Sequence, residues 1–164
     1  MREDFCDILS VFGVKKELFD QKISDISEKL GVSHLLSKHP YDLSGGEAQK
    51  CALAKVMLTE PNILLLDEPT KAIDPAAKRA LAAVLRTLAN EGITVFAVTH
   101  DVEFAAENAD RCALFFDGEV LAPKPPQEFF SANNFYTTAA SRISRGIFEN
   151  AVTEADVLRL AGGK

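Results

Sequence analysis

Apolar residues recur at three- and four-residue intervals along the first part of the chain, a pattern that predicts amphipathic helices. The first predicted helix runs from Arg2 to Phe12, and the second runs from Leu18 to Leu30 and ends at Gly31. A short helical turn is predicted over residues 32–36. The side chains expected to face the core are Phe5, Ile8, Leu9 and Phe12 in the first helix and Phe19, Ile23, Ile26 and Leu30 in the second.

Two apolar runs farther along the chain predict strands buried in a parallel sheet. They are Ile63–Leu66, which shows no alternation of apolar and polar residues, and Ile93–Thr99. The helix predicted between them begins at Asp74-Pro75, an N-cap followed by proline, and continues to about Asn90. Its apolar face is formed by Ala77, Leu81, Val84, Leu85 and Leu88.

The rest of the chain is predicted to contain a hairpin and short helices. Asp101 can cap a helix that ends near Ala109, and Asp117-Gly118 is typical of a hairpin turn. The remaining predicted elements are strand segments 112–116 and 119–121 and helices at residues 127–131, 135–145 and 153–160. This order of elements indicates an α/β fold with parallel strands, a β-hairpin and a helical carboxyl-terminal tail.

Length, charge, cysteine content and apolar runs limit the classes of protein to which this chain can belong. The chain has 164 residues, enough for one domain with a sizeable core. Its formal net charge is −6, so no positive field favours a nucleic acid or an anionic membrane surface as a partner. Cys6, Cys51 and Cys112 are odd in number and widely spaced, which indicates reduced thiols. No apolar run is long enough to span a membrane, and no signal peptide precedes the first helix, so we predict a soluble, intracellular protein.

A capping-box pattern marks the start of a helix predicted over residues 48–58. Ser44 and Glu47 occupy the two ends of the box, with Gly45 and Gly46 between them. The missing Cβ atoms allow a ligand to approach the backbone closely, and the free N–H groups at a helix N-terminus favour an anion. The pattern therefore indicates a phosphate site or an ordinary helix cap, and by itself it favours the cap.

Two adjacent carboxylates shift the interpretation from a helix cap toward a phosphate site. Asp67 and Glu68 directly follow the first predicted strand, at the carboxyl end where open α/β sheets bind ligands. Adjacent carboxylates there suit the coordination of Mg²⁺ and the polarisation of a water molecule. The glycine turn, helix, strand and acid pair, in this order, favour a phosphate site.

Four segments in this order resemble the motifs of the ATP-binding-cassette (ABC) ATPases. They are LSGGEAQ at residues 43–49, ILLLDE at 63–68, KAID at 71–74 and VTHD at 98–101, which resemble the signature motif, the Walker B strand, the D-loop and the switch-histidine segment. The chain is therefore identified as a member of this family. The tail at residues 133–160 and the EPTKAID segment further resemble the ATPase subunits of energy-coupling-factor (ECF) importers.

The resemblance implies a catalytic set that acts on ATP. Asp67 would hold Mg²⁺, and Glu68 would be the general base that positions the attacking water. His100 would contact the γ-phosphate and sense its loss. ATP and Mg²⁺ are accordingly the expected cofactors.

The resemblance also implies a contact across a dimer. Ser44, Gly45 and Gly46, together with Glu47 in place of the family's commoner Gln, would bind the γ-phosphate of ATP held on a second ABC ATPase domain. Asp74 would lie at the seam between the two domains, in addition to capping its helix. A carboxylate introduced at Gly45 is expected to block this contact while leaving folding nearly intact.

Two expected motifs are missing from the sequence. The 164 residues contain neither the G-x-x-x-x-G-K-[ST] loop that cradles a triphosphate nor a candidate Q-loop, so the chain resembles the carboxyl-terminal half of a P-loop NTPase domain. We expect a partial ABC ATPase domain over residues 1–131, with a helical subdomain over 1–60 and a core over 61–131, followed by a helical tail over 132–164. A truncated gene product, a fragment of a two-cassette chain and a misplaced start codon are all compatible with this pattern.

The leading interpretation is an ATP-hydrolysing subunit of an ECF-type importer for a vitamin or metal ion, present as a fragment that is inactive alone. Its expected partners are a second ABC ATPase domain and a transmembrane coupling subunit at the inner face of the cell membrane, with no nucleic acid. One alternative is a soluble ABC protein of the ABC-F type that acts on ribosomes, although residues 71–73 depart from the Asn-His-Leu expected there. The other is a non-catalytic remnant that binds a partner cassette. The presence of Glu68 and His100 argues against this alternative.

Overall fold

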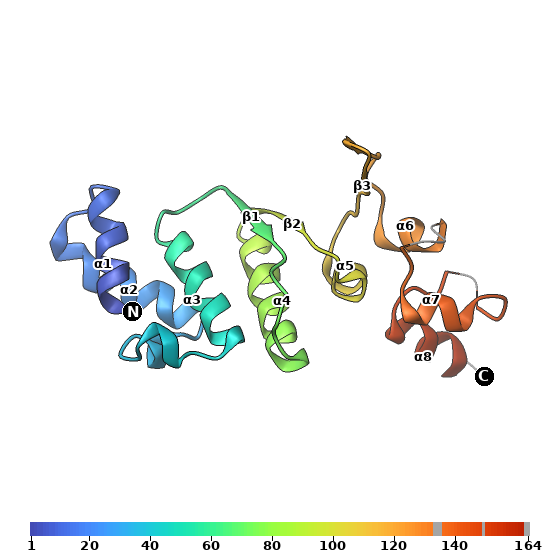
Figure 1. The fold of residues 1–164 in the computed structure, drawn as a ribbon, viewed down its shortest axis with the longest axis horizontal. Helices are drawn as coiled ribbons and strands as arrows, with labels where there is room; N and C mark the ends of the chain where they lie inside the picture. The colour runs from blue at the N-terminus through green and yellow to red at the C-terminus, as the bar shows by residue number, and fades with distance from the viewer. Residues whose placement is uncertain (133–135, 149, 163–164) are drawn as a thin grey trace. The chain divides into compact units, whose positions relative to one another are not determined.

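The computed structural model describes residues 1–132, 136–148 and 150–162, and the chain forms two compact units, Met1–Val98 and Thr99–Lys164 (Figure 1). The first unit contains α1 (Arg2–Val11), η1 (Lys16–Leu18), α2 (Phe19–Lys29), η2 (Ser33–Leu35), η3 (Pro40–Asp42), α3 (Gly45–Met57), β1 (Ile63–Asp67), α4 (Pro75–Asn90) and β2 (Thr94–Val98). The second unit contains α5 (Val102–Asn108), β3 (Phe115–Phe116), β4 (Glu119–Val120), α6 (Pro126–Ala132), α7 (Ala139–Ser144) and α8 (Glu154–Gly162).

The helices at the start of the first unit pack through the stripes that the sequence predicts. Phe5 and Leu9 of α1 are buried, as are Phe19 and Ile23 of α2. The expectation that Phe12 also faces the core is wrong, because α1 ends at Val11 and Phe12, its C-cap residue, is 63% exposed. The packed stripes of α1 and α2 therefore support α3, the helix that carries the glycine turn.

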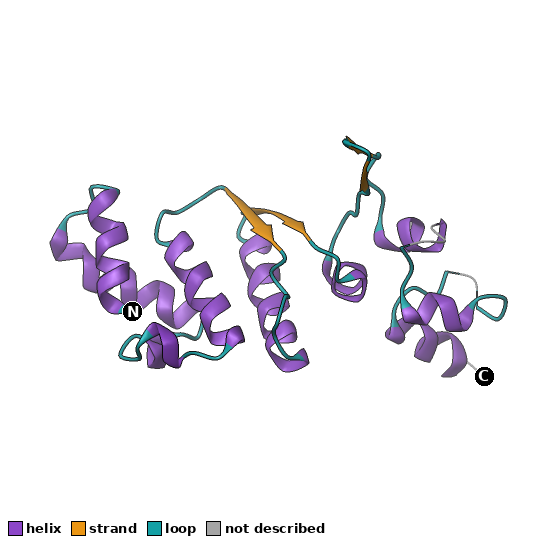
Figure 2. Ribbon diagram, in the orientation of Figure 1, coloured by secondary structure: helices purple, strands orange, loops and turns teal. Residues whose placement is uncertain are grey.

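The two strands of the first unit form the predicted parallel pair, which Figure 2 shows beside α4. The register pairs Ile63 with Thr94 and Asp67 with Val98, so the carboxyl ends of β1 and β2 lie at the same edge. Helix α4 covers one face, on which Leu64 is 2% exposed. This arrangement confirms the predicted parallel α/β pairing.

The predicted burial of both strand faces is wrong. The second face of the sheet carries side chains that are more than half exposed, namely Ile63, Leu65, Phe96 and Val98. The apolar sequence of a strand buried on both faces is present, but among the described residues of this unit no element covers that second face. A run such as ILLL therefore specifies the strand, whereas its burial depends on chain segments that pack against it.

The second unit confirms the predicted hairpin and contains a further helix cap. The Asp117-Gly118 turn joins β3 to β4, and both residues have positive φ (51° and 81°), as a two-residue hairpin turn requires. Thr153 and Asp156 cap α8: the Thr153 N–H donates to Asp156 Oδ2 at 3.0 Å, and the Asp156 N–H donates to Thr153 Oγ1 at 3.2 Å. The predicted helix over 135–145 is shorter in the structure, because Thr138 is the N-cap of α7; Phe135 lies outside the described residues.

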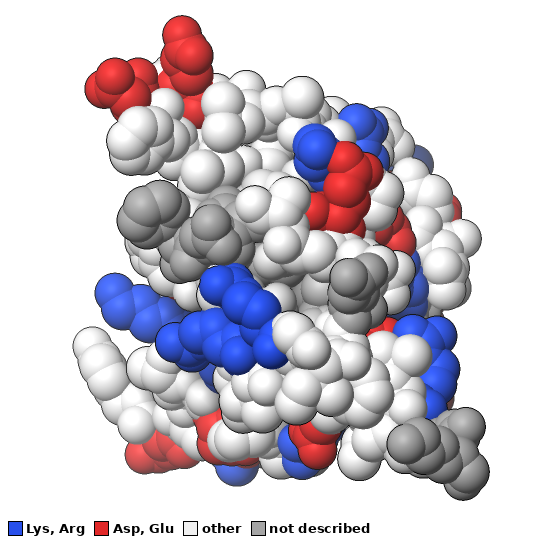
Figure 3. Space-filling view, turned by 90° about the vertical axis from the view of Figure 1, so that its right-hand side faces the viewer, with Lys and Arg blue, Asp and Glu red and all other residues white. Residues whose placement is uncertain are grey.

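The surface carries both signs of charge. On the face shown in Figure 3, basic and acidic side chains are both present among mostly uncharged ones, in keeping with a modest net charge of −6. In the part of the chain that the structure describes, no helix is both long and apolar enough to pass through a bilayer.

Candidate nucleotide-binding site

The N-terminus of α3 is closed by a complete capping box. Ser44 is the N-cap, with extended backbone angles, and its Oγ accepts a hydrogen bond from the Glu47 N–H at 3.3 Å. In return, Glu47 Oε2 accepts from the Ser44 N–H at 2.8 Å. This confirms the predicted cap and fixes the backbone of Gly45 and Gly46 at the positive end of a 13-residue helix.

Glu47 is held in its ionised form. The backbone N–H of Ser44 is the largest cause, followed by the ammonium of Lys38, whose Nζ lies 3.0 Å from Glu47 Oε1, and together these contacts lower the pKa of Glu47 from 4.5 to about 2. The carboxylate is therefore a fixed negative charge at the start of α3 across the physiological pH range.

This pKa predicts an acid-dependent part of the stability. Because the pKa of Glu47 is lower in the folded chain than its ordinary value of 4.5, its stabilising contribution is fully present above about pH 4.5 and is lost as the pH falls toward about 2. We expect a ¹³C NMR titration of the Glu47 carboxyl to give a midpoint near 2. We also expect the melting temperature of Glu47→Gln to depend less on pH than that of the wild type in this window. A midpoint near 4.5 would contradict the observed hydrogen bonding.

The structure gives the two glycines a role in packing. A Cβ on Gly45 would lie 2.9 Å from the carbonyl oxygen of Ala72, and a Cβ on Gly46 would lie 2.6 Å from Cβ of Ala77. These short distances show that the start of α3 packs closely against the segment that leads into α4. The signature and D-loop segments therefore meet within one unit. The expectation that a carboxylate at Gly45 leaves folding nearly intact is therefore wrong. Any side chain at position 45 has a Cβ, and that atom alone requires the backbone at Ala72 to move.

Replacing Gly46 with alanine tests this contact. Alanine is the better helix former by about 0.5–1 kcal/mol, but overpacking costs about 1–3 kcal/mol, so we expect a net loss of stability. Ala77→Gly removes the opposing Cβ, and Gly46→Ala should then be neutral or slightly stabilising in the Ala77→Gly background. Thermal unfolding of the four members of this double-mutant cycle measures the coupling. Additive effects of the two changes would show that the two Cβ positions do not meet.

Glu68 occupies an unusual backbone conformation at the end of β1. Its φ is +46°, in the left-handed region that non-glycine residues rarely adopt. The Glu68 N–H donates to the carbonyl oxygen of Val98 at 2.8 Å, and its carbonyl accepts from the Lys71 N–H at 3.0 Å. Strained residues that are held in place by their surroundings are concentrated at functional sites, so this geometry supports a functional role for Glu68. Nothing in the sequence signals this backbone angle.

Asp67 is the last residue of β1 and is exposed. Mg²⁺ usually binds one or two carboxylates together with substrate phosphates, and the oxygen donors of Asp67 and Glu68 fit that pattern. Within residues 1–132, 136–148 and 150–162, no group of three or more His, Cys, Asp and Glu side chains could hold a metal by itself. The carboxylate oxygens of Asp67 and Glu68 are donors of the kind that Mg²⁺ takes.

Asp74 caps α4, as the sequence predicts. Its Oδ1 accepts from the N–H groups of Ala76 and Ala77 at 2.8 and 2.9 Å. The hydrogen bond from Ala77 is the largest cause that lowers the pKa of the Asp74 carboxyl. Since Ala77 also contacts the Gly46 position, Asp74 stabilises the segment against which the glycine turn packs.

His100 belongs to the second unit, where it is exposed in a turn before α5. The Asp101 N–H donates to Thr99 Oγ1 at 3.0 Å, and Asp101 Oδ1 accepts from the Phe104 N–H at 3.0 Å. These two bonds fix the backbone on either side of His100. The predicted cap at Asp101 is confirmed, while the role of His100 stays a prediction.

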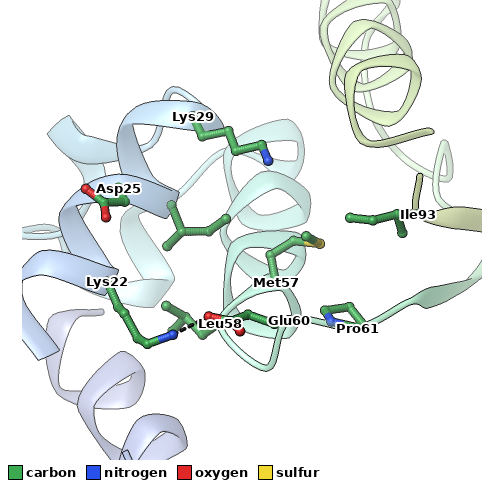
Figure 4. Close-up of a pocket in the computed structure, with 9 residues that line it drawn as sticks. Lys22, Asp25, Lys29, Met57, Leu58, Glu60, Pro61 and Ile93 are labelled. Atoms are coloured by element: carbon green, nitrogen blue, oxygen red, sulfur yellow. Dashed lines mark hydrogen bonds and ion pairs between the residues drawn. The ribbon is translucent and has the colours of Figure 1, made fainter. Parts of the chain in front are cut away.

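The first unit also contains a pocket of about 400 Å³ that none of the predicted site residues lines. In Figure 4, Lys22 and Lys29 of α2 extend toward the end of α3 and the residues that precede β1 and β2. An ion pair joins Lys22 to Glu60 at one side, and Met57, Leu58 and Ile93 contribute apolar walls. The pocket therefore lies apart from the glycine turn and the carboxylates at the end of β1.

Comparison with known families identifies the chain. Residues 3–71 match the ABC transporter family, and this segment contains the glycine turn of Ser44–Glu47 as well as Asp67 and Glu68. The chain is 42% identical over 151 residues to a protein of Bacillus thuringiensis subsp. konkukian described as an ABC transporter ATP-binding protein, covering 90% of the chain and 27% of that protein. This chain belongs to the ABC transporter ATP-binding family.

One further relative and one solved structure are also similar to this chain. The energy-coupling factor transporter ATP-binding protein EcfA of Methanothermobacter thermautotrophicus is 32% identical over 145 residues, which cover 88% of this chain and 47% of that protein. The structure of CbiO1 of Clostridium perfringens, part of the ABC transporter complex CbiONQ, matches with a TM-score of 0.68 at 25% identity, over 82% of this chain and 52% of that one. The α/β ABC fold is thereby confirmed, and the chain spans between about a quarter and about half the length of these relatives.

Proposed function

We propose that this ABC chain forms the carboxyl-terminal half of an ATP-hydrolysing importer subunit, and that the N-terminus of α3 binds the γ-phosphate of ATP held on a second ABC ATPase domain. The geometry at the start of α3 carries the proposal. The capping box fixes the backbone of Gly45 and Gly46 at the positive end of the helix, where N–H groups and the helix dipole favour a bound phosphate.

In the proposed reaction the residues at the end of β1 act on the attacking water. Glu68 accepts a proton from this water as its oxygen bonds to the γ-phosphorus, and the bond from that phosphorus to the bridging oxygen of ADP breaks. Asp67 would hold Mg²⁺, which neutralises charge on the phosphate oxygens when bound. His100 would hydrogen-bond the γ-phosphate, and Asp74 would lie at the seam of the two domains.

We further propose an importer of the energy-coupling-factor type, with a vitamin or a metal ion as the transported substrate. The similarity to EcfA extends over 145 residues, more than the 131 that precede the predicted tail, so it includes part of that tail. By contrast, the glutamine transport protein GlnQ of Geobacillus stearothermophilus matches over 104 residues. In this proposal the partners are a second ABC ATPase domain and a transmembrane coupling subunit, at the inner face of the cell membrane.

The test compares the 164-residue chain with a complete cassette, in which Met1 is joined to the amino-terminal half-domain of the Bacillus relative. We expect the chain alone to bind ATP too weakly for calorimetry at micromolar concentrations and to show no turnover, because the P-loop supplies most phosphate contacts. The complete cassette should bind and hydrolyse ATP. Micromolar ATP affinity of the chain alone, or a complete cassette that binds ATP without hydrolysing it, would contradict the proposal.

A further inference from the structure

An ion pair lies directly beside the proposed phosphate site. Lys38 follows η2, and its Nζ is 3.0 Å from Glu47 Oε1, while the other carboxylate oxygen of Glu47 accepts from the Ser44 N–H at 2.8 Å. The Lys38 side chain is 41% exposed and that of Glu47 is 29% exposed. One carboxylate thus connects an ammonium group to the cap of α3.

This carboxylate creates a conflict for an anionic ligand. At the third position of α3, a negative charge interacts favourably with the helix dipole in the absence of ligand. A γ-phosphate that approaches the same N-terminus is repelled by that charge, and the repulsion increases as the interface excludes water. Glu47 also accepts the hydrogen bond of the Ser44 N–H, so this donor is not available to the phosphate while the capping-box hydrogen bonds are formed.

We propose that Lys38 is a positioning residue of this site: it neutralises Glu47 and holds it in the capping box, so that the α3 N-terminus can accept an anionic γ-phosphate. The inference rests on the proposed function. Lys38 lies on the segment before the helix and is nine residues from Glu47, so neither the signature pattern nor helical spacing includes it. It would tune how tightly this turn binds the nucleotide without contacting the reacting atoms.

A double-mutant cycle on the complete cassette tests this role, with the apparent Kd of ATP-dependent dimerisation as the readout. Lys38→Met keeps the apolar stem but removes the charge, and we expect it to weaken dimerisation about tenfold at low salt. Glu47→Gln removes the charge that Lys38 neutralises. In that background Lys38→Met should change the Kd by no more than about twofold.

Two controls separate a positioning role from a structural one. The effect of Lys38→Met should decrease as salt is raised, because screening weakens charge interactions near the surface, whereas a packing defect would persist. Wild-type affinity for Lys38→Met, or an equal loss in the Glu47→Gln background, would overturn the inference. Ser44→Asp tests the proposed function itself. If Ser44→Asp and Lys38→Met both dimerise normally, the proposed phosphate site is wrong. If Ser44→Asp blocks dimerisation and Lys38→Met does not, only the proposed role of Lys38 is wrong.

Discussion

Replacing Glu68 with glutamine in the complete cassette is expected to lower steady-state ATP hydrolysis by about 10²- to 10⁴-fold, the usual contribution of a general base. The amide preserves the size of the side chain but cannot accept the proton of the attacking water. The backbone contacts that fix this position, with Val98 and Lys71, involve no side-chain atom and should persist. ATP-dependent dimerisation should therefore be retained, because the phosphate contacts proposed to close the dimer lie at α3.

Glu91→Gln is a matched control for this experiment. Glu91 is a carboxylate of the same unit that pairs with Lys29 beyond the end of α4, so the same chemical change there should leave turnover near the wild-type rate. Single-turnover kinetics separate a slower chemical step from altered product release. A Glu68→Gln cassette that hydrolyses ATP at a rate near wild type would show that another group is the base.

The features that sequence alone could predict are those encoded by neighbouring residues. The capping box at Ser44, the N-cap at Asp74 and the Asp117-Gly118 hairpin each depend on side chains within a few positions, and all three are confirmed. Local hydrogen bonding and backbone preference determine such features, whatever the rest of the fold does. The parallel pairing of β1 and β2 also followed from the order of the elements.

The features that sequence could not predict arise between distant segments. Gly46 meets Ala77 across 31 positions of the chain, and neither residue has a side chain whose chemistry signals the contact. The left-handed backbone of Glu68 likewise results from how β1, β2 and the following turn fit together. Packing against α4 is therefore a reason for glycine at position 46 that the sequence pattern did not reveal.

The exposed face of the sheet connects fold and function. Leu65 and Phe96 are adjacent across the strand pair and are 73% and 59% exposed, although their sequence environment is that of a buried strand. Burial of such side chains is a main source of folding free energy, so this face favours association with an apolar surface. In the proposed cassette, the half-domain that carries the triphosphate loop would supply that surface. The same association would then bury the apolar face of the sheet and complete the nucleotide site.

Replacing Ser44 with aspartate distinguishes a phosphate site from a simple helix cap. Aspartate caps helices about as well as serine, so α3 should retain its stability to within about 1 kcal/mol. Unlike a side chain at Gly45, the substitution meets no backbone obstacle, because position 44 is exposed and already carries a Cβ. The new carboxylate would, however, face the γ-phosphate, and repulsion between two unit charges at 4 Å amounts to about 4 kcal/mol at an effective dielectric constant of about 20.

We therefore expect Ser44→Asp to weaken ATP-driven dimerisation of the complete cassette by about 10²- to 10³-fold, while binding of ATP to its own P-loop is preserved. Ser44→Asn is the matched control, since asparagine is an equally good N-cap without the charge and should dimerise far better than the aspartate variant. Light scattering with and without ATP measures dimerisation, and thermal melting confirms that both variants are folded. If the two variants dimerise equally well, charge at this position is irrelevant, and the turn at Ser44–Gly46 is a helix cap alone.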